Sequence, residues 1–392
     1  MKNHKIYIKL FFLTPIILIL LIIRIFKKFN ISKLISHKIG HMTTPMEIYI
    51  CEKKDDPKKI PVIWFFDKKI ANQFLKKHWS EKLFILPRQL FEPIYILFNK
   101  YKFFNIFLAN FSKESEKVKK AVYNGVKHID DKDVLLKYEP SIKFNHKEKE
   151  EGQQYLKKIG IQNEKFFVFV SRTPEFHNEI GQSVRNSDIQ NKILGVKFLV
   201  SKGYKAIRMG KFESTFINFN DSNIIDYATS GDRSDFLDIY LISKCEFILS
   251  DSTGNTSTAN LFRKPCLTVN EFTPHSLEHH PEKVMILPKK IKNLHTGKFI
   301  SFEEAYKKKF NYIKSFSQFN ELGYEVIDNS EHEIEKATES FYDLINNDLN
   351  LDEILKKQKK YWHNVEKYVG DENKYKTIVC PNFYLNNNDL FE

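Results

Sequence analysis

Six short apolar runs in the second half of the chain limit what it can fold into. They cover residues 166–170, 204–208, 224–227, 247–250, 266–269 and 284–287. Helical patterns at 188–201, 234–244 and 256–262 separate several of them. Strands of this length that alternate with helices predict a parallel sheet with helices on both faces.

The first half of the chain shows a weaker pattern of the same kind. Residues 60–66 and 83–86 are predicted strands, and 68–79 is a predicted helix between them. A charged helix over 147–158 is expected to link this half to the next. At 392 residues, the chain is longer than one core usually supports. We therefore expect an α/β fold with two Rossmann-like domains that face a cleft.

The predicted domain boundaries follow from these patterns. We expect an N-terminal hydrophobic segment at 1–30, two domains at 31–150 and 151–347, and a helical tail at 348–392. The tail is expected to pack back across the first domain.

The N-terminal segment that precedes the first domain is strongly hydrophobic. Residues 10–23 carry no charge and have basic residues on both sides. This run is shorter than the roughly 20 residues that a straight membrane-spanning helix needs, although 6–26 can span if Lys9 and Arg24 snorkel. Alternatively, Pro15 can kink the segment into an interfacial hairpin. In either form, the segment predicts attachment to a membrane.

The residues that follow this segment predict its orientation. A cleaved signal peptide is the competing interpretation, but no small-x-small cleavage site follows Ile23. Lys27, Lys28, Lys33 and Lys38 come next, and the positive-inside rule then places the body of the protein in the cytoplasm, at the inner membrane.

The net charge limits the classes of binding partner, and the cysteine content indicates the redox compartment. The formal net charge is +13, and the lysines are spread along the chain, which fits an anionic membrane surface or a polyanionic ligand. No finger, recognition-helix or RNP-like motif is present, so specific nucleic-acid binding is not expected. The four cysteines show no paired spacing, which favours a reducing compartment.

Polar residues follow several predicted strands at the point where each strand ends. They are Ser171, Arg172 and Thr173, then Arg208, then Asp226 and Tyr227, then the stretch Ser-Asp-Ser-Thr-Gly-Asn-Thr at 250–256. Ligands of open α/β sheets bind at these carboxyl ends. Arginine forks and a hydroxyl-rich turn at a helix start suit a diphosphate.

The stretch at 250–256 is the strongest candidate for a phosphate cradle. Ser252, Thr253 and Gly254 are expected to lie closest to the phosphate charge. The stretch is neither a Walker loop nor a dinucleotide fingerprint, because the glycine and lysine patterns of those motifs are missing. The alternative is an ordinary strand-to-helix turn with a good N-cap.

The remaining candidate residues each have a structural alternative. Arg172 and Arg208 can be ion-paired, and Ser234 and Asp235 can cap a helix instead of bordering a ligand. His41 is a candidate base because its ordinary pKa lies near neutral pH, although it can equally be a packing histidine. No group of residues shows metal-ligand spacing, so neither a metal nor a cofactor is expected.

Five blocks together resemble a little-characterised bacterial family of glycosyltransferases. They are KIGHMTTPMEIYI at 38–50, VRNSDIQNKI at 184–193, GYKAIRMGK at 203–211, IDYATSGDRSDFLDIYLISKCEFILSDSTG at 225–254 and LFRKPCLTVN at 261–270. The family carries IGH, YRNSDI, IRMG, SDFLDIYL and SG blocks in the same order, and the match runs from about 39 to 341. The layout is more distantly similar to fucosyltransferases and other GT-B enzymes. Val184 replaces an aromatic residue of the family, and Asp251-Ser252-Thr253 replaces a shorter Ser-Ser-Gly turn.

The resemblance implies a GT-B-like fold, a nucleotide-sugar donor and no obligatory metal. The first domain would bind the acceptor and the second the donor. Carried over by position, the site residues divide into two groups: catalytic His41, Arg185 and Arg208, and donor-binding Arg172, Asp226, Tyr227, Ser234, Asp235, Ser252, Thr253 and Gly254.

These observations predict a membrane-associated, metal-independent glycosyltransferase. It would move a hexosyl or deoxyhexosyl group from a nucleotide-diphosphate sugar to a surface glycan or a lipid-linked acceptor. Two alternatives stay open, a GT-B-shaped nucleotide-sugar epimerase and a non-catalytic membrane-tethered module that binds nucleotide sugar or glycan. Only the transferase requires an acceptor for turnover.

Overall fold

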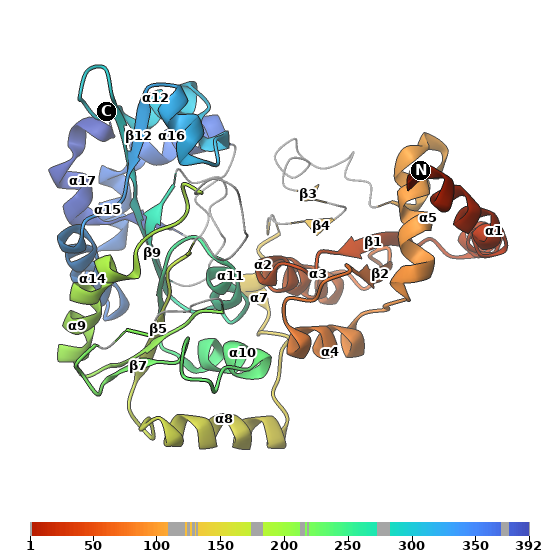
Figure 1. Ribbon diagram of the computed structural model, residues 1–392, viewed down its shortest axis with the longest axis horizontal. Coiled ribbons are helices and arrows are strands. Elements are labelled where there is room, and N and C mark those ends of the chain that lie inside the picture. Colours follow the sequence, from red (N-terminus) through yellow and green to blue (C-terminus); the bar gives the residue numbers. More distant parts are fainter. Residues whose placement is uncertain are drawn as a thin grey trace. The chain divides into compact units, whose positions relative to one another are not determined.

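The computed structural model divides into two compact units, Met1–Ile142 and Lys143–Glu392 (Figure 1). It describes residues 2–108, 122–123, 126–127, 130, 132–173, 183–211, 216–217, 219–272, 283–369 and 376–391. Each unit is described by itself below.

The second unit contains the strands and helices that the alternating pattern predicts. Its described elements are α8 (His146–Lys158), β5 (Phe166–Phe169), η3 (Ile189–Lys192), α9 (Ile193–Ser201), β6 (Lys205–Arg208), β7 (Ile224–Asp226), α10 (Asp235–Lys244), β8 (Ile248–Ser250), α11 (Gly254–Leu261), β9 (Cys266–Glu271), β10 (Val284–Pro288), β11 (Lys290–Asn293), α12 (Phe302–Lys307), η4 (Phe310–Tyr312), α13 (Phe316–Glu321), β12 (Tyr324–Ile327), α14 (Glu331–Ile345), α15 (Leu351–Lys357), α16 (Lys359–Val369), β13 (Ile378–Val379), α17 (Pro381–Asn386) and η5 (Asn388–Leu390).

Seven of these strands form one sheet in the order β13-β10-β9-β8-β5-β6-β7. All of its pairings are parallel. The chain adds β6 and β7 on one side of β5, and then returns to add β8, β9 and β10 on the other side. The strand order therefore reverses between β5 and β8, which is where ligands bind in open sheets of this type.

Helices cover both faces of this sheet because successive strand residues point to opposite sides. Phe167 and Phe169 pack with α9, α14 and the C-terminal helices in one core cluster. Val168 and Val170 pack with α8 and α10 in the other. This arrangement confirms the predicted α/β class with a large parallel sheet.

The C-terminal segment belongs to the second unit. Residues from α16, β13 and α17 lie in the same core cluster as Phe167, and β13 pairs with β10 at the edge of the sheet. The tail expected at 348–392 therefore completes the sheet of the second unit. Its strand is only two residues long, too short for a periodicity signal.

The described residues of the first unit contain much less sheet than a full Rossmann-like domain. Its described elements are α1 (Lys2–Phe26), β1 (Asn30–Leu34), α2 (Ile39–Met42), α3 (Thr44–Asp55), β2 (Val62–Phe66), α4 (Gln73–Lys82), α5 (Arg88–Lys100), η1 (Lys102–Phe107), β3 (Val122–Tyr123), β4 (Val126–Lys127) and α7 (Val134–Lys137). β1 and β2 form a two-stranded parallel sheet, and the run expected as a strand at 83–86 contributes one bridge, Trp64 to Ile85.

The N-terminal hydrophobic segment folds as a single helix. α1 continues through Pro15, so the described chain has no hairpin there. Within the described residues, no helix is both long enough and apolar enough to cross a membrane. The first unit ends at Ile142, so residues 143–150, expected in the first domain, belong to the second.

α8 joins the second unit through a close approach to α10. A Cβ atom at Gly152 would lie 2.2 Å from the ring of Tyr240, which is buried. Tyr155 packs edge-on against Tyr227, with ring centroids 5.8 Å apart. Glycine is therefore required at position 152 because a rigid aromatic ring occupies the space of a side chain.

We expect Gly152→Ala to destabilise the second unit. Alanine improves helix propensity by about 1 kcal/mol, but overpacking of a rigid core contact costs about 1–3 kcal/mol. The thermal unfolding midpoint should fall by several degrees. Gln153→Ala, at an exposed position on the same helix, is the control and should leave the midpoint unchanged or raise it. An equal midpoint for Gly152→Ala and wild type would show that Tyr240 moves freely.

Candidate functional site

The point where the strand order reverses carries an ion pair with no solvent exposure. Lys192 Nζ lies 2.7 Å from Asp251 Oδ1, and both side chains are 0% exposed. Asp251 directly follows β8, and Lys192 ends η3, so 59 residues of chain separate the two. The pair ties the segment after β5 to the end of β8.

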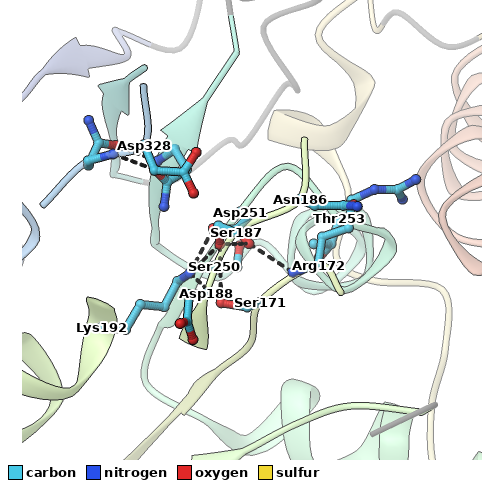
Figure 2. Close-up of polar contacts among 12 residues, drawn as sticks. Ser171, Arg172, Asn186, Ser187, Asp188, Lys192, Ser250, Asp251, Thr253 and Asp328 are labelled. Carbon is cyan, nitrogen blue, oxygen red and sulfur yellow. Dashed lines mark hydrogen bonds and ion pairs between the residues drawn. The ribbon is translucent and has the colours of Figure 1, made fainter. Parts of the chain in front are cut away.

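Every charged atom of this pair has hydrogen-bond partners (Figure 2). Lys192 Nζ also donates to Ser171 Oγ at 2.6 Å and Ser187 Oγ at 3.2 Å. Asp251 Oδ2 accepts from the Arg172 backbone N–H at 2.8 Å and from Ser187 Oγ at 2.7 Å. A buried charge pair is tolerated only when its remaining donors and acceptors are satisfied in this way.

The pair holds the segments after β5 and β8 in a fixed position. The Arg172 backbone is fixed from both sides, since its carbonyl accepts from the Ser187 backbone N–H at 3.1 Å. The Asp251 carboxylate accepts one of these bonds on Oδ1 and two on Oδ2. We interpret Lys192 and Asp251 as positioning residues for Arg172 and the turn at 252–254.

The turn after Asp251 opens helix α11 in the manner predicted. Thr253 is its N-cap and accepts from the Asn255 backbone N–H at 3.2 Å. Thr256 closes the reciprocal bond to the Thr253 backbone N–H at 3.3 Å and also bonds Ser250 Oγ at 2.8 Å. The hydroxyl groups of this stretch thus serve the turn itself, which is the N-cap alternative, while the helix start still favours an anion.

Arg185 reaches this turn from the loop before η3. Its guanidinium donates to the Ser252 backbone carbonyl and lies 3.4 Å from Ser252 Oγ. Both partners are neutral, and no carboxylate among the described residues forms an ion pair with Arg185. The start of α11 therefore has a cation beside it whose charge is not balanced by a described neighbour.

Arg208 and Asp226 form a second buried ion pair at the adjacent strand ends. The Arg208 guanidinium lies 2.8 Å from Asp226 Oδ2, and each side chain is 3% exposed. Asp226 Oδ2 also accepts from the Ile217 backbone N–H at 3.1 Å and from Thr229 Oγ1 at 3.0 Å. A phosphate bound at Arg208 would have to compete with this carboxylate, which is the ion-paired alternative considered above.

Tyr227 and Asp238 form a polar network at the start of α10. Tyr227 Oη lies 3.0 Å from Asp238 Oδ1 and accepts from the Ser234 backbone N–H at 3.1 Å. Asp238 Oδ2 also lies 2.5 Å from the Arg233 guanidinium. Burial raises the pKa of the Asp238 carboxyl, although Arg233 and Tyr227 oppose the shift. Burial likewise raises the pKa of the Tyr227 hydroxyl.

Ser234 and Asp235 occupy the N-terminus of α10. Ser234 is the N-cap, and its Oγ accepts from the Leu237 backbone N–H at 3.1 Å. Asp235 lies in the first turn, 3.8 Å from Lys211 Nζ and 4.0 Å from Arg233. The described contacts of these two residues are those of a helix start.

A third buried cation supports the loop that carries Arg185. Lys289 has a fully buried side chain, and it donates to the Asn186 carbonyl at 2.8 Å and to Asp328 Oδ1 at 2.6 Å. Burial lowers the pKa of Lys289, and the charge of Asp328 opposes that shift. The loop is thus held from β10 as well as from β8.

The strands that carry the predicted donor contacts are consecutive neighbours. β8, β5 and β6 lie side by side, and adjacent strands are about 4.8 Å apart. Their carboxyl ends, with Ser252, Arg172 and Arg208, therefore span about 10 Å. A nucleotide diphosphate with its sugar is long enough to reach across this edge.

His41 lies in the other unit, in the short helix α2. Its role as a catalytic base stays a prediction, because the two units are each described by themselves. Among the described residues, no cluster of histidine, cysteine, aspartate or glutamate side chains can hold a metal ion.

Sequence reasoning missed the residues that hold this site together. Ser171, Ser187, Lys192 and Asp251 lie in stretches that the sequence analysis singled out, but none of them was assigned a role, and Lys289 lies outside those stretches. Two signals were available: Asp251 directly follows an apolar strand, and Ser187 and Lys192 belong to the block at 184–193. The burial of Lys192 was not predicted, because lysine in a predicted helix normally faces solvent.

Comparison with known proteins gives only distant structural likenesses. No protein-family model and no curated protein matches the sequence. A glycosyl transferase family 9 structure from Veillonella parvula has 10% identity and a TM-score of 0.43, covering 80% of this chain and 97% of that one. ADP-heptose LPS heptosyltransferase II of E. coli has 11% identity and a TM-score of 0.39, with coverages of 62% and 87%. UDP-GlcNAc 2-epimerase from Neisseria meningitidis has 13% identity and a TM-score of 0.33, with coverages of 62% and 83%. Values this low establish neither a shared family nor a shared activity.

We expect Lys192→Met and Asp251→Asn each to destabilise the protein by about 3–5 kcal/mol, because each leaves one buried charge without its partner. The double variant should lose clearly less than the sum of the two, by about 0.5–3 kcal/mol. Urea unfolding followed by circular dichroism measures these differences. Lys158→Met, which breaks an exposed pair with Asp232, is the control and should cost no more than about 1 kcal/mol. Strict additivity of the two buried substitutions would contradict the coupling.

Proposed function

We propose that the protein is a glycosyltransferase that uses a nucleotide-diphosphate sugar as its donor. The observation that carries this proposal is the polar edge of the sheet at β5 and β8. There the Lys192–Asp251 pair positions Arg172 and the start of α11, and Arg185 contacts Ser252. The resemblance of the sequence blocks to a glycosyltransferase family supports the same conclusion.

The charges of this edge favour an anionic group. Lys192 balances Asp251, and Arg208 balances Asp226, so these two pairs add no net charge. Arg185 adds a positive charge next to a helix N-terminus, where the helix dipole also favours an anion. A diphosphate is the part of a nucleotide sugar that needs such an environment. In this proposal, Ser252, Thr253 and Gly254 border it.

The proposed reaction is a displacement at the anomeric carbon of the donor sugar. An acceptor hydroxyl oxygen forms a bond to that carbon, and the bond to the diphosphate oxygen breaks. Arg185 stabilises the negative charge that develops on the leaving diphosphate. His41, in the first unit, is the proposed acceptor of the hydroxyl proton.

Arg208 acts in this proposal through Asp226. Because its guanidinium is buried in the pair, it would fix the ends of β6 and β7 beside the nucleotide, together with Tyr227, Ser234 and Asp235. Arg172 remains a proposed donor contact. These assignments need no metal, since arginines would supply the positive charge.

The acceptor and the location are proposed from the N-terminal sequence. An apolar segment followed by lysines suits a protein at the inner membrane with its body in the cytoplasm. A surface glycan or a lipid-linked acceptor under assembly would be available there.

We expect Arg185→Ala to weaken donor binding by at least about tenfold. A charged hydrogen bond contributes about 1.5–3 kcal/mol, and each 1.4 kcal/mol is a factor of ten. The first step is a thermal-shift screen of the full chain in mild detergent against GDP-, UDP-, CMP-, CDP-, ADP- and dTDP-sugars. Titration calorimetry with the selected donor then compares wild type, Arg185→Ala and Arg185→Lys. Lysine should restore part of the affinity, because it keeps the charge but not the planar fork.

The controls separate the three candidate activities. Arg88→Ala, which breaks a half-buried pair in the first unit, should bind the donor as wild type does. Unchanged affinity in Arg185→Ala would remove the basis of the proposed site. Turnover of the donor without any acceptor would identify an epimerase. Donor binding without turnover across a panel of acceptors would favour a binding module.

A further inference from the structure

Helix α1 is attached to the first unit by one of its faces. Leu13, Ile17 and Leu20 are spaced four and three residues apart, which places them on the same side of a helix. All three are buried in a cluster that includes Phe91, Ile94 and Phe98 of α5. α1 is therefore a packed part of this unit and does not extend freely from it.

The opposite face of α1 is also apolar, but it is exposed. Phe12 is 74% exposed, Ile25 79% and Phe26 85%. Leu18, Ile19, Ile22 and Ile23 are also exposed. A surface helix of a soluble unit normally has polar residues on this side. The two phenylalanines alone leave more than about 200 Å² of apolar surface in contact with solvent, at about 150–250 Å² per aromatic side chain.

The exposed apolar surface continues from α1 onto η1. Arg24, in the last turn of α1, donates to the backbone carbonyls of Phe29 and Ile106, and its guanidinium lies 5.0 Å from the Phe107 ring centroid. Ile106 itself is exposed, as is Phe103, at 71%. We call these exposed side chains of α1 and η1 the outer apolar face. Contiguous apolar surface of this size marks an interaction site.

The sequence next to the outer apolar face is rich in positive charge. The chain has no aspartate or glutamate before Glu47, and seven lysines and one arginine precede it. Lys27 and Lys28 follow α1 directly, and Lys100 and Lys102 flank the start of η1; all four are exposed. A partner for this face should therefore be apolar at its centre and negatively charged at its rim.

We propose that the outer apolar face docks onto an anionic lipid bilayer, with α1 lying in the plane of the membrane surface. Acyl chains would cover the side chains of Phe12, Ile22 and Phe26, and lipid phosphates would pair with the lysines. α1 cannot be surrounded by lipid, because Leu13, Ile17 and Leu20 stay packed on α5. A second copy of the chain fits less well, since it would bring the same positive charges to the interface. This inference does not depend on the proposed transferase activity.

Vesicle co-sedimentation of the full chain tests the proposal. Wild type should bind vesicles in which about one lipid in three is phosphatidylglycerol, and bind pure phosphatidylcholine at least about tenfold more weakly. Binding to the anionic vesicles should also weaken as salt is raised. Ile22→Glu/Phe26→Glu should reduce the partition coefficient at least about tenfold, since two apolar side chains no longer enter the membrane. Both positions are exposed, so the variant should keep the far-ultraviolet circular dichroism of wild type.

A matched control separates this surface from a general effect of added charge. Leu322→Glu/Leu385→Glu introduces the same two charges at exposed apolar positions of the second unit and should bind vesicles as wild type does. Equal vesicle binding by Ile22→Glu/Phe26→Glu and wild type would overturn the proposal. So would equal binding to neutral and anionic vesicles, or a wild-type dimer in light scattering that the variant dissociates. None of these readouts depends on donor binding, so this proposal and the transferase proposal can fail independently.

Discussion

The ion pair between Lys192 and Asp251 is the interaction on which the candidate site depends. It lies where the order of the parallel strands reverses, so it joins the segments that flank the expected ligand position. A buried pair of this kind adds little net stability, because desolvation offsets the attraction between the charges. Its contribution is geometrical. Once the charges are buried, the backbone of Arg172 and the start of α11 can occupy only positions that keep both ions satisfied.

Ion pairing also decides which cations remain for a ligand. Arg208 is one of the two arginines that the strand-end pattern predicted, yet its guanidinium pairs with Asp226. Arg185 comes from a loop with no strand pattern of its own, and it lies against the turn before α11. Arg208 has a carboxylate as its partner, whereas Arg185 contacts the carbonyl and hydroxyl oxygens of Ser252. In a medium of low dielectric constant, a carboxylate within 3 Å dominates the local field.

The first unit, unlike the site of the second, is notable for apolar surface that remains exposed. Its two-stranded sheet and α5 bury one face of α1, and the other face remains apolar and exposed. Burial of that face would stabilise the unit, but the described part of the chain does not cover it. The basic residues around it favour an anionic covering. One face of α1 thus belongs to the core of the first unit, and the other forms the outer apolar face.

The sequence by itself determined the alternation of strands and helices from β5 to β10 in the second unit. Short apolar runs predicted the strands at β5 to β10, because a parallel sheet buried on both faces needs continuous apolar residues. It also predicted the helix start at Ser234 and, as one alternative, an N-cap within 250–256, since capping depends on residues only a few positions apart. Only the tertiary structure decided that Lys192 meets Asp251, that Arg208 meets Asp226, and that β13 completes the sheet. These contacts join segments far apart in the chain, and no local pattern encodes which distant side chain a buried charge will meet.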